Sequence, residues 1–106
     1  MTKVTVHSGA CGFSVMITAE KGAGGKTAVS LKTECEMVMK MLEDIAVLDR
    51  FATLAGFLNN PVYQSAARRL KHAACPVPSG ILKGLEVEAG LNVTKDVTIV
   101  FVKEKQ

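Results

Sequence analysis

The sequence contains no tryptophan and few aromatic residues of any kind, with four phenylalanines and one tyrosine in 106 residues. Proteins that bind single-stranded nucleic acid need aromatic side chains on which bases can stack. The net charge is only +3, and the lysines are spread along the chain. Long apolar runs are also missing, and none is long enough to span a bilayer. We therefore expect neither a nucleic-acid partner nor a membrane-spanning segment.

A secretory signal is missing as well, because residues 1–20 alternate polar and apolar positions instead of forming a continuous apolar stretch. This pattern predicts a cytoplasmic protein. Cysteines are few, and their number, three, is odd. In a reducing compartment an odd set of cysteines argues against a disulfide framework and favours a metal site or reactive thiols.

The apolar content, in contrast, is ample at 48% of residues. This share supports a packed core and argues against disorder. The length suits one core, and no linker, internal repeat or low-complexity stretch divides the chain. We expect a single α+β domain over residues 1–106.

Three strands are predicted near the N-terminus, over residues 3–7, 13–20 and 26–32, because polar and apolar residues alternate there. Glycine-rich connections separate them. The last predicted strand, residues 96–103, carries Val97, Ile99 and Phe101 on one face and Thr98, Val100 and Val102 on the other. A strand that is apolar on both faces is typical of a sheet interior or of a face covered by a partner, and a homodimer is one such expectation.

Helices are predicted between these strands. Thr33 and Glu36 have the spacing of a capping box, which predicts a helix from there to about Asp49. Further helices are expected over residues 50–58, 62–71 and 79–89, with Asn60 and Ser79 as N-caps. The resulting order, βββ-ααα(α)-β, indicates a mostly antiparallel sheet of about four strands with helices packed on one face.

The stretch from His72 to Gly80 is the centre of the candidate site. Pro76 and Pro78 keep it from being helical, and it holds Cys75 just before a predicted helix. The chain's densest basic patch is Arg68, Arg69, Lys71 and His72. It favours a solvated helix face, with a small anionic partner as the alternative. Cysteine near a helix N-terminus is favoured as the thiolate, which is the form that binds metals and attacks electrophiles.

All three cysteines fall at predicted junctions and none continues an apolar stripe. Cys11 lies in a glycine-rich turn, Cys35 near the first helix N-terminus, and Cys75 in the proline-flanked turn. With His72 or an exogenous molecule in the fourth position, they predict a site for zinc or an iron–sulfur cluster. Three protein ligands would leave a position open for a small ligand or for a donor from another protein. The alternative is three unrelated thiols, and the residues do not decide whether the protein is an enzyme.

Two resemblances add to this interpretation. The stretch Ser8–Phe13, the single cysteine opening the first helix, and the run from His72 to Lys83 resemble a family of small three-cysteine proteins of anaerobic bacteria and archaea. That resemblance implies that Cys11, Cys35 and Cys75 matter, and an anaerobic setting would suit an iron–sulfur cluster. It implies no particular activity.

The second resemblance is local. Cys75-Pro76-Val77-Pro78, opening a helix, resembles the Cys-Pro-x-Pro element of TusA-like sulfur carriers, although here the element lies late in the chain. The resemblance implies that Cys75 would carry a persulfide. A third hypothesis is a non-enzymatic dimeric interaction module that uses Val100, Val102 and Met16 and needs none of the thiols.

Overall fold

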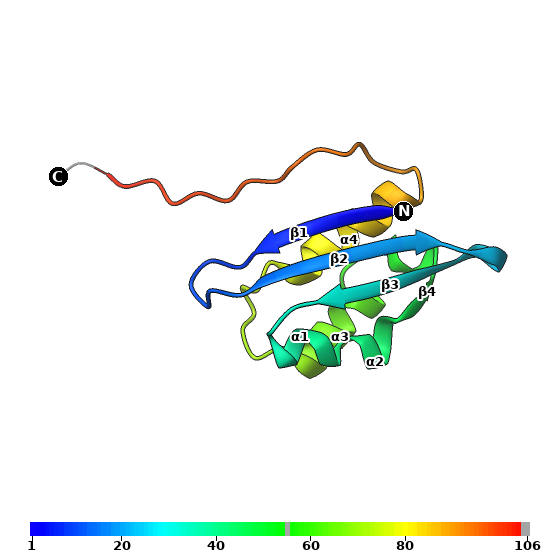
Figure 1. Ribbon diagram of the computed structural model, residues 1–106, viewed down its shortest axis with the longest axis horizontal. Helices are drawn as coiled ribbons and strands as arrows, with labels where there is room; N and C mark the ends of the chain where they lie inside the picture. Colours follow the sequence, from blue (N-terminus) through cyan, green and yellow to red (C-terminus); the bar gives the residue numbers. More distant parts are fainter. Residues whose placement is uncertain (55, 105–106) are drawn as a thin grey trace.

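The computed structural model describes residues 1–54 and 56–104, without the side chain of residue 52. It has a four-stranded antiparallel sheet of β1 (Thr2–His7), β2 (Ser14–Lys21), β3 (Lys26–Lys32) and β4 (Val47–Asp49), in the order β1-β2-β3-β4. Figure 1 shows the helices gathered on one side of this sheet. The predicted α+β class and the approximate number of strands are confirmed.

The alternation that predicts the first three strands also sets the two faces of the sheet. Apolar side chains of β2 and β3, among them Val15, Ile17 and Leu31, point toward the helices and are nearly inaccessible to solvent. The opposite face is exposed and mostly polar, and Met16 and Val47 are its large apolar side chains. A single turn, η1 (Ala23–Gly25), joins β2 to β3, and Gly24 and Gly25 have the positive φ angles expected of this connection.

The fourth strand is a correction to the sequence prediction. The helix expected from Thr33 to Asp49 is instead α1 (Glu36–Lys40), α2 (Leu42–Ile45) and then β4. Leu48 follows Ile45 at helical spacing, so its burial fits a helix as well as a strand. Pairing decides between them, because Leu48 lies opposite Thr27 of β3 and the Val29 N–H donates to the Ala46 carbonyl.

The caps of α1 also differ from the prediction. Cys35 is the N-cap, and its N–H donates to the Thr33 hydroxyl at 3.2 Å, so Thr33 closes a local turn and does not begin a capping box. In place of the helix expected over residues 50–58, the described part of the chain has a 3₁₀ turn, η2 (Ala52–Leu54). Residue 55 of the expected helix lies outside the described residues.

The two longer helices begin differently. α3 (Pro61–Arg69) has the predicted cap, because the Asn60 side chain accepts hydrogen bonds from the N–H groups of Val62 and Tyr63. α4 (Val77–Glu88) begins before the predicted Ser79, with Pro76 as its N-cap. At its end Gly90 has φ +77°, as its C-cap signal predicts.

Helix α4 crosses β1 and β2 closely because two of its residues lack side chains. A Cβ at Gly80 would lie 2.4 Å from Val6 Cγ2, and one at Gly84 would lie 3.1 Å from Val4 Cγ2. Glu88 lies farther along, where it accepts a hydrogen bond from the Thr2 hydroxyl at 2.7 Å. α4 therefore runs antiparallel to β1, and its N-terminus lies where β1 ends.

The strand predicted over residues 96–103 is wrong. This segment has no strand pairing, and its residues are exposed. Figure 1 shows it leaving α4 and running past the sheet as an extended chain. The alternating pattern is there, but a strand also needs a neighbour that supplies backbone hydrogen bonds. Within residues 1–54 and 56–104, no helix is long and apolar enough to cross a membrane.

Candidate functional site

The three cysteine-bearing segments lie at one end of the sheet, which we call the cysteine end (residues 8–13, 33–35 and 70–76). The β1–β2 turn holds Cys11. Lys32, at the end of β3, pairs with Met16 near the start of β2. The segment with Cys35 comes directly after β3, so it begins at the same end of the sheet as the β1–β2 turn. α4 begins at the same end, because Gly80 lies against Val6. Figure 1 shows the three segments at the end to which the β1 arrow points.

Cys11 lies at the tip of the β1–β2 turn and is exposed. The Ser8 N–H donates to the Phe13 carbonyl at 3.1 Å, and the Gly12 N–H donates to the Gly9 carbonyl at 2.9 Å. Gly9 and Gly12 both have positive φ, which glycine adopts without a steric penalty. The backbone of this turn is therefore well defined, while its cysteine side chain faces solvent.

Cys35 has the opposite environment. It is 9% exposed and belongs to the hydrophobic core, although it is also the N-cap of α1. Free cysteine commonly behaves as a small buried hydrophobic residue. Its position in the core favours a packing role for this thiol.

Cys75 has an intermediate environment. It is half-buried against the edge of the core, one residue before the N-cap of α4, and its N–H donates to the His72 carbonyl at 3.2 Å. The His72 side chain itself is exposed. After Cys75, both Val77 and Pro78 are buried, which anchors the turn.

The cysteine end does not form a preassembled metal site. Among the described residues, no three or more His, Cys, Asp or Glu side chains form a group that could hold a metal ion. The fold thus brings the segments of Cys11, Cys35 and Cys75 to one end without placing the three thiols and His72 in a ligand set. The three segments are far apart in the sequence. Their shared position at one end therefore follows only from the pairing of the strands.

A shallow depression lies beside two of these segments. Its volume is about 440 Å³, and it is lined by Gly12, Phe13, Ser14, Lys32, Thr33 and Glu34. These residues flank Cys11 and Cys35 in the chain. A second depression of about 260 Å³ lies between η2, α3 and α4 and includes Tyr63 and Lys83 but no cysteine. The first depression is open, and four of its six lining residues are polar or charged, which suits a contact surface better than an enclosed ligand pocket.

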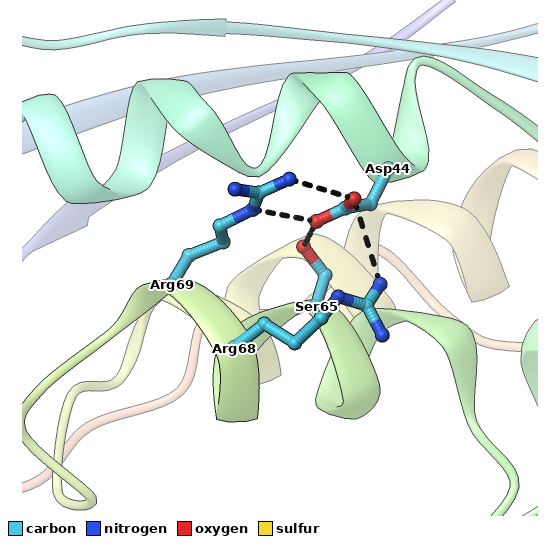
Figure 2. Close-up of polar contacts among 4 residues, drawn as sticks. All are labelled: Asp44, Ser65, Arg68 and Arg69. Carbon is cyan, nitrogen blue, oxygen red and sulfur yellow. Dashed lines mark hydrogen bonds and ion pairs between the residues drawn. The ribbon is translucent and has the colours of Figure 1, made fainter.

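The basic residues before Cys75 divide into two groups. Figure 2 shows that Arg69 and Arg68 both point toward Asp44 of α2. Arg69 donates from Nε and Nη2 at 3.0 and 3.1 Å, the Ser65 hydroxyl donates at 2.7 Å, and Arg68 Nη2 lies 3.5 Å away. These contacts join α2 to α3. Lys71 and His72 are exposed and remain the basic side chains closest to Cys75 in the sequence.

The Asp44 carboxylate is the most perturbed acid among the described groups. Its side chain is only 15% exposed, and the hydrogen bonds from Arg69 and Ser65 hold its pKa well below the ordinary range. The same contact raises the pKa of Arg69. Its hydrogen-bond partners lie 21 and 25 residues away in the sequence, so local patterns do not reveal this contact. Half of the basic patch is therefore structural.

The geometry defines a small α+β protein whose candidate chemistry is that of thiols at one end of an antiparallel sheet. Residues 2–101 match DUF6951, a family of unknown function, and the chain belongs to that family. No curated protein and no solved structure matches it significantly.

Proposed function

We propose that this protein is a small sulfur carrier in which the Cys75 thiol holds a transferable sulfur atom. The observation that carries the proposal is the position of Cys75. It is the one cysteine in the described chain that is both half-exposed and directly ahead of a helix of twelve residues. Cys35 is buried in the core and precedes a helix of only five residues, while Cys11 precedes no helix.

The local structure supports an anionic sulfur at this position. The first turn of a helix has backbone N–H groups without intrahelical partners and a partial positive charge, and both stabilise anions. Pro76 and Pro78 lack N–H groups but keep the backbone rigid. The exposed Lys71 adds a positive charge four residues before Cys75 in the sequence. A persulfide anion placed here would be held in a defined orientation and remain accessible to a partner.

The reaction is a thiol–persulfide exchange. The Cys75 thiolate attacks the outer sulfur of a donor persulfide, a new sulfur–sulfur bond forms, and the old one breaks to release the donor as a thiolate. One sulfur atom moves, and the electrons balance without an external oxidant. Delivery to an acceptor thiol is the same exchange in reverse. The donor is a partner protein or a small persulfide.

The test is intact-mass analysis after incubation with a small-molecule persulfide under anaerobic conditions. We expect the protein to gain the mass of one sulfur atom, with the modification mapped to Cys75. The Cys75→Ser variant should gain none, whereas Cys11→Ser should gain the same sulfur as the unsubstituted protein. Loading that survives Cys75→Ser, or follows Cys11 instead, would contradict the proposal.

The metal hypothesis is tested in the same samples. Its support is that the segments holding Cys11, Cys35 and Cys75 share one end of the sheet. Binding zinc or an iron–sulfur cluster requires Cys35 to turn out of the core and the Cys11 turn to close over it. The measurement is elemental analysis of anaerobically purified protein. Stoichiometric zinc, or iron with sulfide, that is lost in the Cys35→Ser variant would favour the metal hypothesis over the sulfur carrier.

A further inference from the structure

The segment after α4 exposes an unusual amount of apolar surface. Five large apolar residues lie within six positions, and each is between 60% and 97% exposed; they are Val97, Ile99, Val100, Phe101 and Val102. Single exposed apolar residues are common, but a contiguous group of this kind marks an interaction site. The match to the family covers residues 2–101 and so includes most of this segment. The segment therefore belongs to the unit that the family shares.

The fold also has a free sheet edge of matching length. β1 is an outer strand of the sheet, and its six residues pair with β2 along their whole length. In the described chain, no strand pairs with the other side of β1. That side presents backbone N–H and C=O groups that can accept another strand. β1 contains no proline, which would block such pairing.

The open face of the sheet is a poor alternative docking surface. Its residues from β1 to β3 are mostly polar or charged, and Met16 is the large apolar member. A partner packing on this face would cover charged groups, including Lys3, Glu20 and Lys32, without pairing them. At the β1 edge, in contrast, Val4 and Val6 point toward the helices and are only half-buried. A strand added there would complete their burial.

The direction of the segment after α4 indicates which chain would supply the strand added at the β1 edge. It favours a second copy of the protein over the same chain. Because α4 runs antiparallel to β1, the segment that follows it sets out in the same direction as β1 (Figure 1). On its own β1 it could pair only in the parallel sense, which is the less stable arrangement per residue. Instead it continues beyond the body, and the molecule is 56 Å long but only 29 Å and 25 Å across.

We propose that two copies of this chain form a dimer in which residues 96–102 of each copy add, as an antiparallel fifth strand, to the β1 edge of the other. The dimer is closed, because each copy both donates one segment and accepts one. This inference does not depend on the chemistry of Cys75.

The alternation of the two strands specifies a register. Val4 and Val6 face the helices, so Ile99 and Val97 should lie opposite them in an antiparallel pair. In the same register Asp96 lies opposite His7, and Thr98 lies opposite Thr5 on the open face. Val100 then lies opposite Lys3, also on the open face.

The first experiment compares two neighbouring substitutions by light scattering coupled to size-exclusion chromatography. Ile99→Lys places a charge on the side that faces the helices, and we expect it to abolish the dimer. Val100→Lys places the same charge on the open face, and we expect it to weaken the dimer less than tenfold. A monomeric unsubstituted protein across the micromolar to millimolar range would overturn the proposal. Loss of the dimer with Val100→Lys but not Ile99→Lys would overturn it in favour of packing through the open face.

The second experiment identifies which copy supplies the strand. Copies of different size, one with Thr5→Cys and one with Thr98→Cys, are mixed and oxidised in a background of Cys11→Ser and Cys75→Ser. We expect a disulfide-linked species of the summed mass. A parallel pairing of the segment with its own β1 that places Ile99 beside Val4 would instead place Thr98 opposite Lys3. Crosslinking within a single chain that carries Lys3→Cys and Thr98→Cys, with no crosslink between copies, would overturn the proposal.

Discussion

The guanidinium of Arg69 donates two hydrogen bonds to the carboxylate of Asp44, from Nε at 3.0 Å and from Nη2 at 3.1 Å. This two-point contact joins α2 to α3, and the hydroxyl of Ser65, also in α3, donates a further hydrogen bond to Asp44. Charge-assisted pairs of this geometry are stronger than hydrogen bonds between neutral groups. Because α2 has only four residues, its position depends on such tertiary contacts more than on its own helical hydrogen bonds.

The first prediction concerns the pH dependence of stability. The folded state holds the pKa of Asp44 below its unfolded value, so the carboxylate stabilises the fold fully above about pH 5 and loses this contribution as the pH falls. We expect Asp44→Asn to be less stable than the unsubstituted protein at neutral pH, with the difference narrowing below about pH 4. Urea unfolding from pH 2 to 7 measures this. Arg68→Met is the control, because Arg68 is 56% exposed and its nitrogen lies 3.5 Å away, and it should have little effect.

A pH-independent difference between the two proteins would contradict this prediction. Glu88 contributes its own acid dependence, because hydrogen bonds from the Lys21 N–H and the Thr2 hydroxyl lower its pKa. That contribution is common to both proteins and cancels in the comparison.

The second prediction concerns the close approach of α4 to the sheet. A Cβ at Gly80 would lie 2.4 Å from Val6 Cγ2, whereas one at Gly84 would lie 3.1 Å from Val4 Cγ2. Both substitutions to alanine gain the same helix propensity of roughly 1 kcal/mol, so the difference between them reports the steric contact. Overpacking a core typically costs about 1–3 kcal/mol. We expect Gly80→Ala to be less stable than Gly84→Ala by about 1–2 kcal/mol in urea unfolding, and equal stabilities would show that α4 shifts away freely.

The sequence predicts the parts of the fold that local patterns determine. β1 to β3 follow from alternation, and α3 follows from Asn60 and Pro61 at its start. β4 could not be predicted, because Leu48 suits a helix and a strand equally and its pairing with Thr27 is nonlocal. The reverse holds for residues 96–103, where the pattern is that of a strand but the described part of the chain supplies no neighbouring strand. For β4 and for residues 96–103 alike, backbone hydrogen bonds to a neighbouring strand decide whether a strand forms. Composition and periodicity do not reveal that neighbour.

The candidate site shows the same division. Spacing and junction positions select Cys11, Cys35 and Cys75 as a group, yet their environments differ from exposed to buried. Only the tertiary fold distinguishes the three cysteines. Cys35 lies at the start of a helix, a position that predicts a reactive thiol, but its side chain is buried in the core. The pairing of Asp44 with Arg69 is not predictable from local patterns for a related reason, since the two residues are 25 positions apart.

The third prediction concerns the start of α3. Asn60 is 3% exposed, its side-chain oxygen accepts from the Val62 N–H at 2.9 Å, and its amide donates to the Thr53 carbonyl. Asn60→Ala removes the cap and leaves a buried carbonyl without a partner, which should cost about 2 kcal/mol. Asn59→Ala is the matched control, because Asn59 is exposed, and it should change the free energy of unfolding by less than about 0.5 kcal/mol. Similar losses in the two variants would show that the cap does not stabilise α3.

The last prediction concerns the order in which the three thiols react. Cys11 is exposed, Cys75 is half-buried and Cys35 lies in the core. Under native conditions an alkylating reagent should modify both Cys11 and Cys75 before Cys35. Cys35 should react more than about a hundredfold slower than Cys11, because attack on it requires an opening that costs several kcal/mol. Peptide mass analysis over time measures the three rates, and denaturant should bring them close together. Rapid native modification of Cys35 would mean that its segment opens readily, which is the movement that a shared metal site at the cysteine end requires.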